Sequence, residues 1–94
     1  MYSKIDEDDL WKIINHFGKP LQLLKLSEES GEVSRAIIRK ECGVTLTNHE
    51  ITEEISDLLV VINQLMLLYE VDEKEVEQIM KYKVIKTMDK YNIN

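Results

Sequence analysis

The amino-acid sequence predicts an all-α fold, a four-helix protomer whose helical bundle is completed by homo-oligomerisation. Apolar residues recur with the helical period, and no segment shows the sustained alternation of a half-buried strand. The chain has only three glycines and one proline, and Gly18, Pro20 and Gly43 lie at breaks between helical segments. With 94 residues, the chain is expected to form one domain over 1–94.

The first two helices are predicted from their start and stop signals. The first is expected over 6–17, with Asp6 as the N-cap and further carboxylates in the first turn, where the helix dipole favours them. The second is expected over 20–42, because proline is tolerated in a first turn and Gly43 is a natural stop. A loop is expected at 44–46.

The last two helices are predicted to begin with capping boxes, in which a cap residue and an acid three positions later exchange hydrogen bonds. The third is expected over 47–70 and opens on Thr47 and Glu50, and the fourth is expected over 72–91 and opens on Asp72 and Glu75.

The third helix is apolar around nearly its whole circumference, which is typical of a helix surrounded by others. One short protomer cannot easily cover such a helix. We therefore expect neighbouring copies to cover it, in a homodimer or homotetramer.

Aromatic residues of the first helix are candidates for stacking on, or contacting the edge of, a planar ligand. They are Trp11, His16 and Phe17. For Trp11 a place in the hydrophobic core is the favoured expectation, because the apolar stripe of this helix surrounds it.

The charge and the apolar pattern exclude several classes of protein. A formal net charge of −6 argues against a nucleic-acid binder, which needs a basic face, but not against a nucleotide held through metal ions. Cys42 is the only cysteine, so no intrachain disulfide is expected. The start of the chain lacks the pattern of a signal peptide, and the longest apolar run, 58–69, is too short to span a membrane. We expect a cytoplasmic protein with no nucleic-acid or membrane partner.

Carboxylates are paired at one-turn spacing on two successive helices. Glu29 and Glu32 border an apolar stripe on the second helix, and Glu54 and Asp57 share a face of the third. If the two pairs face each other, four negative charges share a small volume and require a cation. Mg²⁺ or Mn²⁺ is the natural partner of an all-carboxylate set. Each pair could equally be a solvated helix face, and both interpretations stay open on these residues alone.

A di-iron carboxylate site does not fit the sequence. Such a site needs Glu-x-x-His on two helices. The two histidines, His16 and His49, are preceded at that spacing by Ile13 and Leu46. Chemistry on phosphates would therefore depend on divalent cations and lysines, since there is no glycine-rich phosphate loop.

These acids also carry a resemblance to a known family. Glu28-Glu29-x-x-Glu32, followed after 21 residues by Glu54-x-x-Asp57, resembles the signature of the MazG-like nucleoside triphosphate pyrophosphohydrolases, which belong to the all-α NTP pyrophosphatase superfamily. The similarity covers 16–70 well and the first and fourth helices by general pattern. It implies hydrolysis of a nucleoside triphosphate between the α and β phosphates, giving the monophosphate and pyrophosphate, in nucleotide-pool cleaning or control.

The resemblance also implies roles for individual residues. Glu29, Glu32, Glu54 and Asp57 would be ligands of Mg²⁺, for which Mn²⁺ could substitute. Glu28 and Glu29 would be catalytic, with Glu28 an auxiliary ligand or the group that orients the attacking water. The substrate would be contacted by Lys25, Asn63, Lys83 and Lys86.

Each of the substrate-binding assignments has a structural alternative. Lys25 has the spacing of an ion pair with Glu29. Asn63 could instead make a hydrogen bond between helices. The lysines of the fourth helix could instead stabilise its C-terminus by interacting with the helix dipole. The whole chain has an alternative as well, a non-catalytic helical oligomer that binds a partner, regulates, or senses nucleotides.

Overall fold

The computed structural model describes residues 5–43 and 47–94, so the loop expected at 44–46 lies outside the described residues. Its helices are α1 (Glu7–Phe17), α2 (Lys19–Glu41), α3 (Asn48–Leu68) and α4 (Glu73–Lys90). These two described stretches contain no strand. The predicted all-α, four-helix protomer is confirmed.

The first break is made by a glycine in a conformation that other residues avoid. Asp6 caps α1 by accepting a hydrogen bond from the amide of Asp8 at 2.8 Å, as predicted. The helix ends at Phe17, and it is followed by Gly18, whose φ of 84° lies in the left-handed region. Because Gly18 itself makes the turn, α2 begins at Lys19, one residue before the predicted start, and Pro20 lies in its first turn.

The capping box of α3 is confirmed. The Thr47 hydroxyl accepts from the Glu50 amide at 3.1 Å, and the Thr47 amide donates to the Glu50 carboxylate at 2.7 Å. The helix ends at Leu68, two residues before the predicted end, because the chain turns through Glu70 at a φ of 52°.

The capping box predicted for α4 is wrong in one respect. Asp72 is the N-cap, but its carboxylate accepts from the amide of Lys74 at 3.0 Å. The described part of the chain shows no reciprocal bond from Glu75. Bonding of an aspartate oxygen to the amide two residues later is a common local alternative to a full box.

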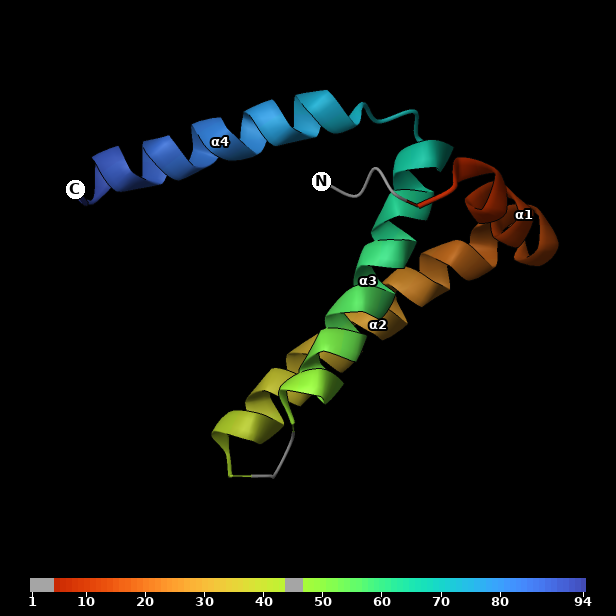
Figure 1. The fold of residues 1–94 in the computed structure, drawn as a ribbon, viewed down its shortest axis with the longest axis horizontal. Helices are drawn as coiled ribbons and strands as arrows, with labels where there is room; N and C mark the ends of the chain where they lie inside the picture. Colours follow the sequence, from red (N-terminus) through yellow and green to blue (C-terminus); the bar gives the residue numbers. More distant parts are fainter. Residues whose placement is uncertain (1–4, 44–46) are drawn as a thin grey trace.

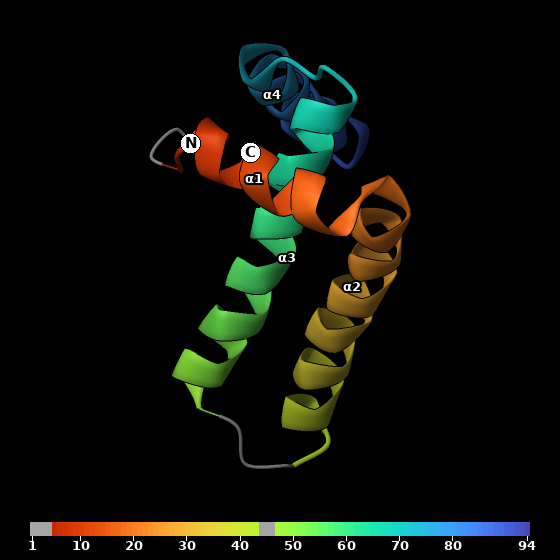
Figure 2. The same cartoon turned by 90° about the vertical axis from the view of Figure 1, so that its right-hand side faces the viewer.

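The helices form an antiparallel pair with α1 across one end. α2 and α3 pack side by side, and α1 packs on both where α2 begins and α3 ends (Figures 1 and 2). The hydrophobic core lies at this crossing, where Leu10, Ile14 and Val61 are buried. Trp11, expected in the core, is 37% exposed, because the inward face of α1 is taken by Leu10 and Ile14, one turn apart.

The last helix extends away from the other three and has no buried residue (Figure 1). The radius of gyration is 16.1 Å, whereas a compact domain of this length has about 12 Å. The accessible surface is 7499 Å², roughly 1,800 Å² more than the size scaling of compact monomers gives. Much of the excess is apolar, since Tyr82, Val84 and Ile85 are all about 60% exposed.

None of the helices in the described stretches is long and apolar enough to cross a membrane.

Candidate functional site

Three of the predicted ligands meet where α2 faces α3. Glu29 of α2 and Glu54 and Asp57 of α3 each place a carboxylate oxygen within 4.8 Å of the other two. The two α3 acids share a face because they are one turn apart. The antiparallel packing of α2 brings Glu29 against them, and it is the most buried of the three, with 9% of its surface exposed.

Glu32 lies outside this three-carboxylate cluster. Its Oε1 accepts a hydrogen bond at 2.7 Å from Nη2 of Arg35, one turn further along α2. The guanidinium group lies over Gly31, where an added Cβ would come within 3.0 Å of it. This ion pair was not predicted from the sequence, although the three-residue spacing of Glu32 and Arg35 is typical of ion pairs on a helix.

Among the acids of the cluster, Glu54 has a shifted pKa. Partial burial first, and then the negative charges of Glu32, Asp57 and Glu29, raise the pKa of the Glu54 carboxyl above its ordinary value. A cation placed among these oxygens would relieve the repulsion. The donor set consists of carboxylate oxygens alone, and it therefore fits Mg²⁺ or Mn²⁺ better than a softer metal.

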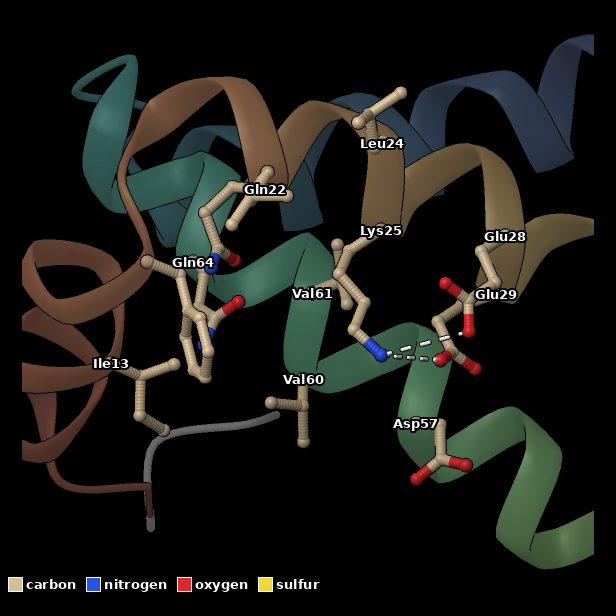
Figure 3. Close-up of a pocket in the computed structure, with 12 residues that line it drawn as sticks. Ile13, Gln22, Leu24, Lys25, Glu28, Glu29, Asp57, Val60, Val61 and Gln64 are labelled. Carbon is tan, nitrogen blue, oxygen red and sulfur yellow. Dashed lines mark ion pairs between the residues drawn. The ribbon is translucent and has the colours of Figure 1, made fainter.

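Lys25 provides the nearest positive charge. Its Nζ lies 3.7 Å from Oε1 of Glu28 and 3.6 Å from Oε1 of Glu29 (Figure 3). The ion pair with Glu29 that the spacing predicts is therefore present. Half of the lysine side chain is exposed, so the ammonium group is also accessible to a ligand in the neighbouring pocket.

A pocket of about 640 Å³ extends from these charged residues toward α1. Glu28, Glu29 and Asp57 lie at one end of it, with Lys25 beside them (Figure 3). Apolar side chains from all three helices form most of the wall, among them Ile13, Phe17, Leu21, Val60 and Val61. Its volume is within the range of pockets that hold small molecules.

Two buried glutamines complete the wall. Gln22 is 2% exposed and Gln64 is 3% exposed. Neither glutamine was predicted from the sequence as a site residue. The available signal was their spacing, since Gln22 is seven residues before Glu29 and Gln64 is seven residues after Asp57.

The first-helix aromatics divide between the pocket and other surfaces. Phe17 lines the pocket, whereas Trp11 and His16 are not part of its wall.

Three predicted substrate contacts lie apart from the cluster within one chain. Nδ2 of Asn63 donates to the carbonyl oxygen of Leu59 at 2.8 Å, within α3 itself, and Asn63 borders a different cavity. Lys83 and Lys86 are on α4, which extends away from α2 and α3 (Figure 1).

Comparison with known proteins gives a match to one family. The model of the MazG nucleotide pyrophosphohydrolase domain matches residues 18–91, a range that contains every acid of the candidate site. No curated protein and no solved structure matches.

Proposed function

The chain belongs to the MazG nucleotide pyrophosphohydrolase family, and we propose that it is an active, Mg²⁺-dependent enzyme that hydrolyses a nucleoside or deoxynucleoside triphosphate to the monophosphate and pyrophosphate. The observation that carries this proposal is the cluster of Glu29, Glu54 and Asp57, with oxygens within 4.8 Å of one another, of which Glu29 and Asp57 also line a pocket of about 640 Å³. A house-cleaning function in the cytoplasmic nucleotide pool would suit this reaction.

The carboxylates of the cluster would hold the cation. Glu29, Glu54 and Asp57 are already close together, and Glu32 would complete the set once its carboxylate leaves Arg35. A bound Mg²⁺ would supply charge neutralisation for the phosphates and polarise the phosphoryl group under attack. The raised pKa of Glu54 supports this assignment, because the cluster lacks enough positive charge of its own.

The charged neighbours of the cluster would position water and phosphate. The Glu28 side chain is 59% exposed beside Glu29, where its carboxylate can accept a hydrogen bond from a water and orient it toward the α-phosphorus. Lys25 would exchange its ion pairs with Glu28 and Glu29 for a phosphate oxygen. The ammonium group would then stabilise the negative charge that develops on the leaving pyrophosphate.

We propose further that the functional unit is a homodimer or homotetramer in which α4 packs against a second copy. The excess surface of roughly 1,800 Å² exceeds the 800 Å² per partner of a standard interface. In such an assembly Lys83 and Lys86 would approach the phosphates from the neighbouring subunit, and Asn63 would contribute to helix packing.

Pyrophosphate release from the eight common nucleoside and deoxynucleoside triphosphates, with Mg²⁺ and with Mn²⁺, tests the proposal. Glu54→Gln should lower the rate by at least about 100-fold, because loss of a group that only supports a metal ligand already costs about 10- to 100-fold. Glu53→Gln is the matched control, because Glu53 is next along α3 but 64% exposed and paired with His49 at 2.9 Å.

Two results would contradict the proposal. Equal activity of Glu54→Gln and the wild type would show that the site is assigned wrongly. Binding of metal and nucleotide without release of pyrophosphate from any of the eight would favour a nucleotide-sensing or regulatory module.

A further inference from the structure

Gln22 and Gln64 are the most buried polar residues in the described part of the chain. Both side chains line the pocket and are at least 97% buried. Oε1 of Gln22 has no hydrogen-bond partner among the described residues. A buried polar atom without a partner destabilises a protein, so the great majority of such atoms are paired in native structures. An unpaired carboxamide oxygen that lines a pocket is therefore available to accept a hydrogen bond from a ligand.

The two carboxamides are placed symmetrically with respect to the acids. Gln22 precedes Glu29 by seven residues on α2, and Gln64 follows Asp57 by seven residues on α3. Seven residues are close to two helical turns, so each glutamine shares the face of its acid about 10 Å further along the axis. Because α2 and α3 are antiparallel, both glutamines lie at the same end of the pocket, opposite the acids (Figure 3).

The pocket therefore has two chemically different ends joined by an apolar wall. One end carries the carboxylates and Lys25, where a phosphate would be held through cations. The other presents carboxamides, each with a hydrogen-bond donor and an acceptor. Val60 and Val61 of α3 lie between the two ends (Figure 3), and Phe17 of α1 is also part of the wall. A nucleotide has matching chemistry, because it carries charged phosphates at one end and, at the other, a planar base with apolar faces and a hydrogen-bonding edge.

We propose that Gln22 and Gln64 are specificity-determining residues that bind the edge of the nucleobase, with Oε1 of Gln22 accepting a hydrogen bond from a base N–H. The inference rests on the proposed function, and it names the part of the substrate that this end of the pocket recognises. The flat faces of the base lie against the apolar wall. A site of this kind discriminates by hydrogen bonding, because a ligand without the matching N–H leaves the carboxamide oxygen unpaired.

Matched variants separate base recognition from structure. Gln22→Met and Gln64→Met keep side-chain length and remove the hydrogen-bonding groups. Gln78→Met, at an exposed glutamine of α4, is the control. Binding of a non-hydrolysable α,β-methylene analogue of each nucleotide is measured by calorimetry with Mg²⁺, beside binding of the 5′-triphosphate of abasic deoxyribose. The Tm of each ligand-free variant is measured as well.

The proposal expects a loss that depends on the base. Gln22→Met should weaken binding of the preferred nucleotide by about tenfold or more, the factor associated with an unmade buried hydrogen bond. Binding of the abasic triphosphate should be unchanged, as should both ligands with Gln78→Met. The Tm of ligand-free Gln22→Met should not fall, since the substitution removes an unpartnered buried oxygen.

Other outcomes would overturn the inference. An equal loss for the nucleotide and the abasic triphosphate, or a fall in Tm with no change in the preference among bases, would assign the glutamines to the fold. If the wild type hydrolyses all the nucleoside triphosphates and the abasic triphosphate equally well, the inference of base recognition fails while the proposed reaction stands. If the analogues bind and depend on the glutamines but no triphosphate is hydrolysed, the reaction fails while the inference stands. Failure of every nucleotide to bind would overturn both.

Discussion

The ammonium nitrogen of Lys25 lies 3.6 Å from Oε1 of Glu29, and that carboxylate is the most buried acid of the candidate metal cluster. The ion pair therefore links Lys25, the proposed phosphate contact, to Glu29, a proposed metal ligand one turn later on α2. Its two partners differ in exposure, since 51% of the lysine side chain is accessible but only 11% of the glutamate side chain.

Lys25→Met should affect substrate binding more than folding. A half-exposed ion pair contributes less than about 1 kcal/mol to the free energy of unfolding, which denaturation in urea measures. Loss of a charge-assisted hydrogen bond to a phosphate should raise KM by about tenfold. The control is Lys12→Met, because the ion pair of Lys12 with Asp9 at 3.7 Å is exposed and neither residue is part of the pocket wall. An unchanged KM for Lys25→Met would show that Lys25 forms its ion pairs but does not bind the substrate.

The raised pKa of Glu54 predicts a pH-dependent stability in buffer free of divalent cations. A carboxyl whose pKa is higher in the folded state stabilises the fold below its unfolded pKa, and this contribution is lost as the pH rises through the folded value. At neutral pH the ionised Glu54 therefore destabilises the protein, and Glu54→Gln should have the higher Tm. The difference should disappear below the ordinary value of 4.5.

Mg²⁺ should reverse this order at neutral pH. Wild type would gain about 2.7 kcal/mol at a metal concentration 100 times Kd, whereas Glu54→Gln would gain little. Glu53→Gln, with its exposed side chain, should respond like the wild type. If Mg²⁺ leaves the wild-type Tm unchanged beyond the effect of matched ionic strength, the cluster does not bind the cation.

Thr47→Ala should destabilise the chain by about 1 kcal/mol, because it removes the side-chain acceptor of the α3 capping box. Thr52→Ala is the control within the same helix, where the hydroxyl only bonds back to the Asn48 carbonyl at 2.8 Å. Alanine is the better helix former at this exposed position, so the control should be neutral or slightly stabilising. Urea denaturation at one fixed protein concentration gives the free energy of unfolding of both variants. Equal free energies would show that the capping box does not stabilise the protein.

Ile85→Glu should dissociate the proposed oligomer. Ile85 is 59% exposed on α4, and an apolar interface there could not accommodate an unpaired charge. Sedimentation velocity should show the wild type as a dimer or tetramer and the variant shifted toward the monomer. Gln78→Glu places the same charge at a polar position of α4 and should leave the mass unchanged. A monomeric wild type would contradict the proposed assembly.

Local features of the sequence predicted most of the secondary structure. Asp6 and Thr47 mark helix starts because their side chains bond to amides only two or three residues away. The boundary errors are one or two residues, and at Lys19 and Leu68 the path of the turn decides where the helix begins or ends. The common face of Glu54 and Asp57 was equally predictable, since both lie on one helix.

Contacts between residues of different helices could not be predicted from such local features. That Glu29 meets the α3 acids while Glu32 bonds to Arg35 depends on the register of α2 against α3 and on a competing partner. The same register buries Gln22 and Gln64 at one end of the pocket, where the sequence shows only polar residues on apolar helices.

By itself, the sequence determined an all-α chain of four helices, the acids of its signature and the family to which they belong. Only the tertiary structure decided which acids meet, which polar groups are buried, and that Asn63 and the lysines of α4 lie apart from the cluster. The physical reason is that helical geometry sets the angle between residues of one helix, so spacing is enough to read it. The register and crossing of two helices depend on the packing of all their side chains, to which no local pattern corresponds.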